Sequence, residues 1–206
     1  GLRMGNSTAI LLPIGFSFYV LQIISYLTDV YKGQQKMEKD FIAFALYLAY
    51  FPKLLAGPIE RAQSLLPPLR RPRIVDATSL EYGLYLIVLG LLRKVVIADH
   101  LRRLYPAEVF TDPGNFTSLE RLVWLVLFVF MLYNDFAGYT TIAQGVSSLF
   151  GIRLSANFRQ PFFAHSFSDF WTRWHITLSE WLRDYLFYPL RRWIMSRRAN
   201  RWLALL

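Results

Sequence analysis

The chain has 206 residues and no cysteine; 54% of its residues are hydrophobic, 17% aromatic and only 18% charged. The absence of cysteine excludes disulfides, thiolate metal sites and a cysteine nucleophile within these residues. The net charge of +9 would suggest nucleic acid in a soluble protein, but the basic residues flank long apolar runs, which is typical of a polytopic membrane protein and argues against a nucleic-acid partner.

The first half of the chain contains two apolar runs. Residues 9–27 carry no charge and are long enough to span a bilayer, with Pro13 and Gly15 predicting a kinked or broken start. Residues 41–55 are interrupted by a proline and a lysine and are short for a span, so a tilted, re-entrant or broken segment is expected. The arginines and prolines of residues 61–76 then predict a basic loop.

Two further runs follow. Residues 80–98 form the third run and contain Arg93 and Lys94 near their end. These two side chains either reach the membrane surface or line a polar interior. Residues 119–133 lead into Asp135, which either caps the next helix or lies inside as a structural or catalytic partner.

The basic residues also give a topology. If all four runs span, residues 57–79 lie on one side of the membrane, and the lysines of residues 32–39 lie on the other with Arg102 and Arg103. The many arginines beyond residue 150 then place the first side in the cytoplasm.

Beyond residue 150 the apolar pieces are shorter and interleaved with Trp, Tyr and Arg, which indicates interfacial or re-entrant helices. Read as a helix, residues 170–190 place five side chains on one face: Trp171, His175, Leu178, Ser179 and Leu182. An imidazole on such an apolar stripe has to be hydrogen-bonded or functional, because burial of an unpaired polar group is costly. A hydrogen-bonded core histidine is the simpler alternative.

General catalytic motifs are absent from the sequence. It has no Gly-rich phosphate loop, no His-Glu-x-x-His and no Gly-x-Ser-x-Gly. His100, His165 and His175 do not share a metal-ligand spacing, so no metal site is expected. The simplest interpretation of Arg173, Arg183 and Asp184 is a solvated or salt-bridged face beside the histidine.

Seven blocks of sequence carry a family resemblance. They are LPIGFSF (12–18), ISYLTDVY (24–31), FPKLLAGPI (51–59), RKVVIAD (93–99), YNDFAGY (133–139), NFRQPF (157–162) and FWTRWHITLSEWLRDY (170–185). In combination they resemble the membrane-bound O-acyltransferase (MBOAT) family, in particular its bacterial alginate O-acetylation branch.

The resemblance implies an all-α integral membrane protein, with a multi-helix ring or funnel that includes kinked, re-entrant and interfacial helices. Residues 1–206 would be a single MBOAT domain, truncated at both ends, in a multi-pass protein of the bacterial inner membrane. The implied activity is transfer of an acyl group, typically acetyl, to hydroxyls of an extracytoplasmic polysaccharide such as alginate. Acetyl-CoA or another acyl carrier would be the co-substrate, with no bound cofactor. Membrane lipid and periplasmic acetylation proteins would be partners.

The motif histidine of the family corresponds to His175. A second family histidine falls downstream of this block, so the chain alone is expected to be inactive. An imidazole suits O-acyl transfer as a base for the hydroxyl proton or as a donor to the acyl carbonyl. We expect the tryptophans of the motif to wall the pocket and exclude water. The tryptophans expected to line the pocket are Trp171, Trp174 and Trp181. The supporting residues are Asp135, Trp171, Arg173, Trp174, Ser179, Arg183 and Asp184.

Three alternatives stay open. The chain could act on lipid or protein within the same family, and acceptor profiling would separate these branches. A transporter or channel would also show broken helices and intramembrane charge. A structural membrane subunit would tolerate loss of His175.

Overall fold

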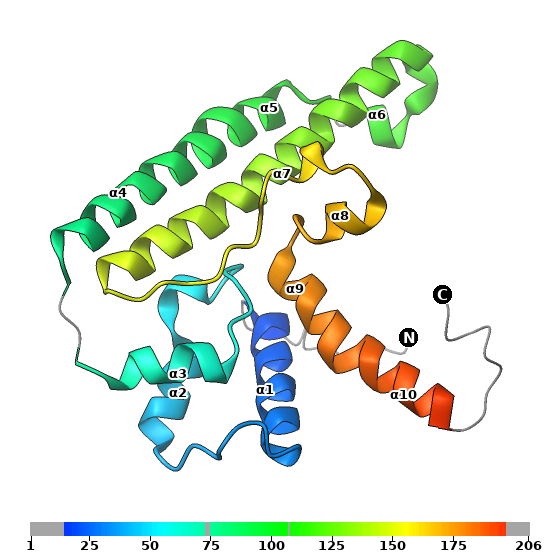
Figure 1. Ribbon diagram of the computed structural model, residues 1–206. Helices are drawn as coiled ribbons and strands as arrows, with labels where there is room; N and C mark the ends of the chain where they lie inside the picture. The colour runs from blue at the N-terminus through cyan, green and yellow to red at the C-terminus, as the bar shows by residue number, and fades with distance from the viewer. Residues whose placement is uncertain (1–14, 73–74, 107, 197–206) are drawn as a thin grey trace, which may run out of the picture.

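The computed structural model describes residues 15–72, 75–106 and 108–196, and this part of the chain consists of helices and connecting segments without a strand (Figure 1). The all-α prediction is therefore confirmed. The helices are α1 (Phe16–Tyr31), α2 (Phe41–Ala49), η1 (Phe51–Lys53), α3 (Ala62–Arg70), α4 (Ala77–Leu91), η2 (Leu92–Ala98), α5 (Asp99–Leu104), α6 (Glu108–Thr111), η3 (Pro113–Asn115), α7 (Ser118–Leu149), η4 (Pro161–Phe163), α8 (Phe167–Trp171), α9 (Ile176–Trp181), η5 (Leu182–Phe187) and α10 (Tyr188–Ser196).

The longest element is α7, which runs through the predicted fourth span and continues to Leu149. Its start is fixed by a capping box: the Glu120 backbone N–H donates to the Thr117 hydroxyl at 3.3 Å, and the Thr117 N–H donates to the Glu120 carboxylate at 2.7 Å. Asp135 lies in the interior of this helix, so the prediction that it caps a following helix is wrong. Gly138, the one glycine of residues 133–139, does not stop α7, because it is buried in the close contact with α4.

Antiparallel to α7 runs a continuous helical stretch, residues 77–104, made of α4, the π-helical η2 and α5 (Figure 1). Glycines allow the two helices to approach closely. A Cβ on Gly83 would lie 2.9 Å from the carbonyl oxygen of Gly145, and a Cβ on Gly145 would lie 2.6 Å from that of Gly83. Small residues at the contact are the usual means of packing helices inside a membrane.

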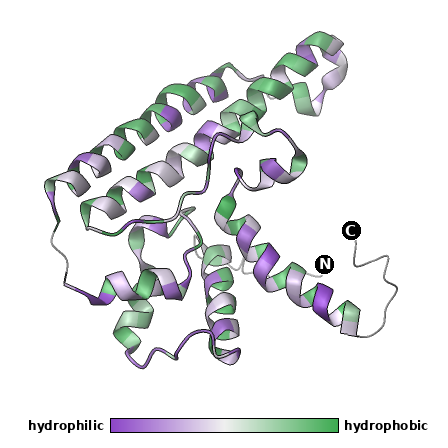
Figure 2. Ribbon diagram, in the orientation of Figure 1, coloured by the Kyte–Doolittle hydropathy of each residue, from purple (hydrophilic) through white to green (hydrophobic). Residues whose placement is uncertain are grey.

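The outer surface of this pair is apolar. Leu84, Val88, Leu122 and Val126 are all more than half exposed, and Figure 2 shows hydrophobic residues along much of α4 and the first half of α7. Within the described ranges, α7 is the one helix that is long and apolar enough to cross a membrane by length and composition. Exposed apolar surface on this scale is unfavourable in water and suits a lipid environment.

The second apolar run, residues 41–55, turns back on itself and does not continue as one long spanning helix. Helix α2 is nine residues long and ends in η1, and the chain then turns back sharply at Gly57, where a Cβ would lie 2.3 Å from Lys53 Cα. The side chain of Lys53 is buried in this turn and donates to the Gln22 side chain and, at 3.3 Å, to the Leu48 carbonyl. The re-entrant alternative is the one that the structure shows.

This turn corrects the predicted topology. Gln63 on α3 donates to the Gln34 carbonyl at 3.0 Å, and Arg70 forms an ion pair with Glu38. The lysines of residues 32–39 and the arginines of α3 therefore lie on the same side, and the prediction that they lie on opposite sides is wrong. The reason is that residues 41–55 enter and leave by one face instead of spanning.

The predicted loop at 61–76 is also corrected, since residues 62–70 form α3 with Pro67 and Pro68 inside it. Tertiary packing outweighs the two prolines, because α3 buries an apolar face against α1 and α2. The cluster comprises Tyr26, Tyr47, Tyr50, Ala62, Leu65, Leu66, Ile152 and Leu154.

Candidate active site

Two segments of the C-terminal part lie side by side and form the candidate site. Phe158 and Trp174 make an isolated antiparallel bridge. Next to it, the Arg159 N–H donates to the Arg173 carbonyl at 2.9 Å, and the Ile176 N–H donates to the Asn157 carbonyl at 3.0 Å. The block at 157–162 is thereby joined to the histidine block at 170–185.

His175 lies at the junction between α8 and α9 and not within a helix. Its φ of 41° is in the left-handed region, which non-glycine residues rarely adopt. The single helical face predicted from Trp171 through Leu182 is therefore wrong, because the backbone reverses between α8 and α9. Such strain is kept where the surrounding structure over-determines it, often at functional sites.

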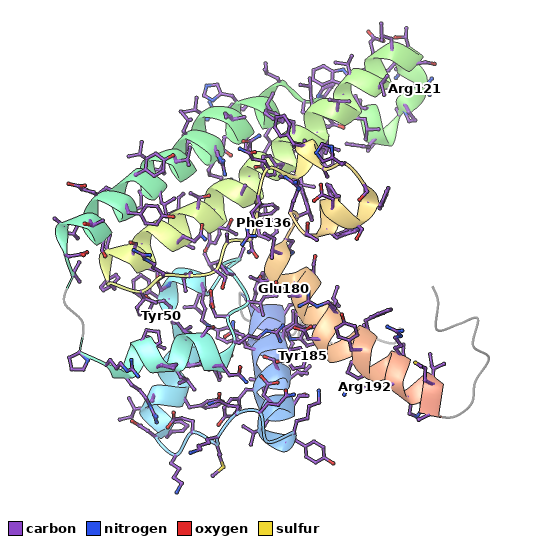
Figure 3. All side chains as sticks on the ribbon, viewed as in Figure 1. Tyr50, Arg121, Phe136, Glu180, Tyr185 and Arg192 are labelled. Atoms are coloured by element: carbon purple, nitrogen blue, oxygen red, sulfur yellow. The ribbon has the colours of Figure 1, made fainter. Side chains whose placement is uncertain are left out.

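The imidazole of His175 is held against α7. Its ring packs edge-on against Phe136 at a centroid distance of 4.8 Å, and Figure 3 shows Phe136 on α7 above the start of α9. Nε2 is buried and has no hydrogen-bond partner among the described residues. Burial lowers the pKa of His175 to about 4, so the ring is neutral at neutral pH.

Behind the histidine, one chain of hydrogen bonds joins three motif blocks. The Ile59 N–H donates to the Thr177 hydroxyl at 3.0 Å, and that hydroxyl donates to Asn157 Oδ1 at 2.6 Å. All three residues are buried. The re-entrant turn, the 157–162 segment and α9 are thus held in one register around His175.

A pocket of about 400 Å³ opens beside this junction. Of the predicted supporting residues it brings together Trp171, Ser179 and Arg183; the complete lining is Arg159, Ser168, Trp171, Thr172, Ile176, Ser179, Glu180 and Arg183. The lining combines a half-exposed indole with cations, a carboxylate and hydroxyls. Such a surface can stack on and hydrogen-bond to a polyhydroxylated molecule.

Two other predicted residues support the backbone of this region. Arg173 forms an ion pair with Asp169 at 2.8 Å, and that bond, with the His165 N–H, lowers the pKa of Asp169 to about 2. Trp174 stacks on Phe170 at 5.6 Å and meets Phe158 edge-on at 5.2 Å. Both residues brace the junction from which His175 projects.

The remaining predicted residues do not line this pocket. Asp184 lines a different, polar pocket of about 330 Å³, where it pairs with Arg61 at 3.2 Å. It also pairs with Arg183 at 2.9 Å, as expected of a salt-bridged face. Trp181 is buried and donates to the Leu21 carbonyl of α1 at 2.9 Å. The expected wall of three tryptophans around one pocket is therefore not formed.

Asp135 joins a charge cluster between α7 and η2. It forms ion pairs with Lys94 and, at 3.3 Å, with Arg102, while Lys94 also reaches Asp99 at 3.2 Å. Asp135 is therefore a half-buried ion-pair partner and not a helix cap, and a catalytic role for it stays a prediction. The cluster joins α7 to η2 and α5 next to Phe136, whose ring contacts His175.

Sequence reasoning did not identify Asn157 and Thr177. Both lie in motif blocks, but no local pattern reveals a hydrogen bond that joins positions 20 residues apart. No group of three or more His, Cys, Asp or Glu in the described part of the chain is placed to hold a metal ion.

Comparison with known proteins places this chain in a family. A model of the MBOAT, membrane-bound O-acyltransferase family matches residues 38–206. The chain is 37% identical to a Pseudomonas putida protein named "Probable alginate O-acetylase AlgI", over all of this chain and 42% of that protein. It is 34% identical to a Helicobacter pylori "Peptidoglycan O-acetyltransferase" (88% of this chain, 39% of the relative). It is 28% identical to a Bacillus subtilis "Teichoic acid D-alanyltransferase" (90% and 49%).

The chain thus spans less than half the length of these relatives. The family match covers most of the chain, including the re-entrant turn, the paired helices and the histidine junction. The chain belongs to the membrane-bound O-acyltransferase family and is part of a membrane protein.

Proposed function

We propose that the protein transfers an acyl group, acetyl in the first instance, to hydroxyls of an extracytoplasmic polysaccharide such as alginate. The observation that carries the proposal is the buried, unpaired Nε2 of His175 on a strained backbone between two braced segments. The relatives named for acetyl or alanyl transfer to alginate, peptidoglycan and teichoic acid support transfer to cell-envelope polymers.

His175 supplies the proton chemistry. O-acyl transfer needs a base that takes the proton of the attacking hydroxyl, and a neutral imidazole can accept it. Burial keeps the ring neutral at physiological pH. The ring's contact with Phe136 restricts its orientation and limits the access of water, which would otherwise hydrolyse the acyl donor.

The acceptor is proposed to enter the 400 Å³ pocket beside His175. Trp171 would stack on a sugar ring, and Ser179 with Arg183 would bind its hydroxyl or acidic groups. The acyl donor, acetyl-CoA or another acyl carrier, is a co-substrate that this pocket does not identify. Periplasmic acetylation proteins remain proposed partners.

The setting is proposed to be the bacterial inner membrane, crossed several times. The paired helices at 77–104 and 118–149 would form part of a ring around a funnel that contains His175. Six basic residues share the face made by residues 32–39 and α3, namely Lys32, Lys36, Lys39, Arg61, Arg70 and Arg71. The positive-inside tendency assigns that face to the cytoplasm.

The test is polymer O-acetylation in cells that carry the full-length gene product, as wild type, His175→Ala or His175→Gln. Glutamine keeps an N–H donor but cannot accept the proton, so both variants should lose acetyl ester at normal membrane abundance. Retained acetylation in both would remove His175 from the chemistry. Activity in the glutamine variant alone would assign a hydrogen-bond donor role instead of a base.

A further inference from the structure

Unpaired buried polar atoms are rare in folded proteins, and each calls for an explanation. Among the described side chains four nitrogen or oxygen atoms are buried without a partner: Arg61 Nη1, Tyr105 Oη, Asn157 Nδ2 and His175 Nε2. The last two belong to the paired segments of the candidate active site.

The orientation of the Asn157 amide is fixed by its neighbours. Oδ1 accepts from the Thr177 hydroxyl at 2.6 Å and from the Thr177 backbone N–H at 3.4 Å. A backbone N–H can only donate, so the atom that it meets is the carbonyl oxygen and the unpaired atom is the NH₂ group. The Thr177 hydroxyl in turn accepts from the Ile59 N–H, which directs its own proton toward Asn157.

The same pairing places residue 157 opposite residue 175. The antiparallel bridge between Phe158 and Trp174 brings position 157 opposite position 175, and the Asn157 carbonyl accepts from the Ile176 N–H. Asn157 is only 1% exposed. The two residues that carry an unpaired buried nitrogen, Asn157 and His175, therefore lie opposite each other in one backbone pairing.

We propose that Asn157 is a catalytic residue whose Nδ2–H group stabilises the negatively charged oxygen that forms during acyl transfer; this inference rests on the proposed function. Acyl transfer passes through a tetrahedral intermediate, and a preorganised N–H donor is most effective in a buried site. The carbonyl half of the amide is used for structure, and the donor half has no structural partner. Thr177 is the positioning residue that keeps the amide from rotating.

The proposed transfer has two stages, formation and collapse of the tetrahedral intermediate. The acceptor hydroxyl oxygen forms a bond to the acyl carbon while His175 Nε2 takes the hydroxyl proton. The carbonyl electron pair moves to oxygen, which accepts a hydrogen bond from Asn157 Nδ2. When the carbonyl re-forms, the bond to the donor's thiol or other carrier atom breaks, and that leaving group receives the proton from His175.

The experiment uses the full-length gene product in cells that lack their own copy, expressed at a level where the wild-type rate is proportional to protein amount. Labelled acetate is given as a pulse, and polymer-bound acetyl ester is counted per membrane-inserted molecule. Asn157→Asp keeps the shape and the oxygen that meets Thr177 but removes the donor. Asn157→Ala removes the whole amide.

Both Asn157 variants should lower the rate about 10²- to 10³-fold, the effect of removing one oxyanion donor. Thr177→Val should lower it about tenfold through misalignment of the amide, and Thr177→Ser should restore the wild-type rate because it keeps the hydroxyl. Thr141→Val is the matched control: Thr141 is also buried, but its hydroxyl bonds only to the Ala137 carbonyl of its own helix, so the rate should not change.

Rates within about threefold of wild type in both Asn157 variants, at equal abundance, would overturn the inference. If the Asn157 variants fail to accumulate, Thr177→Val provides the test, because a wild-type rate in that variant would equally overturn the proposed role of Asn157. Loss of activity in His175→Ala with retained activity in the Asn157 variants would refute this inference and leave the proposed function standing. No polymer acetylation by the wild type would refute both.

Discussion

Gly90 and Gly138 bring the backbones of α4 and α7 into contact: a Cβ on Gly90 would lie 2.7 Å from the Gly138 carbonyl oxygen, and a Cβ on Gly138 would lie 2.9 Å from that of Gly90. The same added Cβ on Gly138 would also lie 2.9 Å from the backbone nitrogen of Lys94. Because backbone atoms cannot move aside as a flexible side chain can, the helices would have to separate to admit a methyl group. The contact holds the charge cluster of Asp135 and the Phe136 ring in place.

Substitution Gly138→Ala should therefore destabilise the protein. Alanine gains up to about 1 kcal/mol in helix propensity, but overpacking costs about 1–3 kcal/mol, so a net loss is expected. Thermal unfolding of the full-length protein in detergent should show a lower Tm. Gly114→Ala is the control, since its nearest atom is Asp112 Oδ1 at 3.8 Å and its Tm should not change. A higher Tm for Gly138→Ala would refute the close packing.

Tyr185→Phe should destabilise the junction between α1 and η5. The Tyr185 hydroxyl donates to both carboxylate oxygens of Asp29 at 2.8 Å, and Asp29 is only 5% exposed. Phenylalanine keeps the ring on which the Arg61 guanidinium stacks at 4.3 Å, so the variant isolates the hydroxyl. An unsatisfied buried acceptor costs about 1–3 kcal/mol.

The measurement is the free energy of unfolding, with Tyr31→Phe as the control because Tyr31 is 92% exposed. Figure 3 shows Tyr185 directed toward α1, where the lost partner would be. Equal stability of Tyr185→Phe and wild type would mean that water replaces the hydroxyl at Asp29.

His175 should make the protein sensitive to acid. Burial lowers its pKa from 6.5 to about 4, so the unfolded chain binds this proton more readily than the folded one. The contribution of the neutral ring to the free energy of unfolding is fully present above pH 6.5 and is lost as the pH drops toward 4. In His175→Gln this contribution is absent. The Tm of the wild type should therefore fall more steeply between pH 7 and 4.5 than that of the variant, and parallel curves would contradict the burial of a neutral imidazole.

The sequence predicts the helical class and most apolar helices because these depend on local composition. Residues 80–98 and 119–133 do form helices, and the interruption at Pro52 and Lys53 does mark a turn. That α3 contains Pro67 and Pro68 in its interior could not be predicted, because the contacts that stabilise this helix come from α1, α2 and residues 152–154. Long-range packing, absent from a local pattern, decides such cases.

The site was predicted in part for a similar reason. The indole of Trp171 and the side chains of Ser179 and Arg183 do share a pocket. The helical reading failed at His175, because the left-handed turn depends on pairing with residues 157–159 rather than on the residues around the histidine. Asp184 and Trp181 were expected beside the histidine on sequence proximity, but the helix from 176 to 196 carries them toward Arg61 and α1.

Cysteine labelling can test the re-entrant turn. Since these 206 residues contain no cysteine, single substitutions give unambiguous positions if any cysteines outside them are first replaced. Lys36→Cys and Arg71→Cys should react with a membrane-impermeant thiol reagent from the same side, because Gln34 and Glu38 bond to α3. Arg103→Cys should react from the opposite side, because the helical stretch 77–104 extends about 40 Å, enough to cross a bilayer.

All three positions are exposed, so a lack of labelling would not reflect burial within the described residues. Labelling in intact cells and in inverted vesicles identifies the side, and the basic face should react only in inverted vesicles if it is cytoplasmic. Reaction of positions 36 and 71 from opposite sides would mean that residues 41–55 span the membrane after all. In that case the turn at Gly57 could not hold Ile59 against Thr177, and the register of the junction around His175 would have to come from elsewhere.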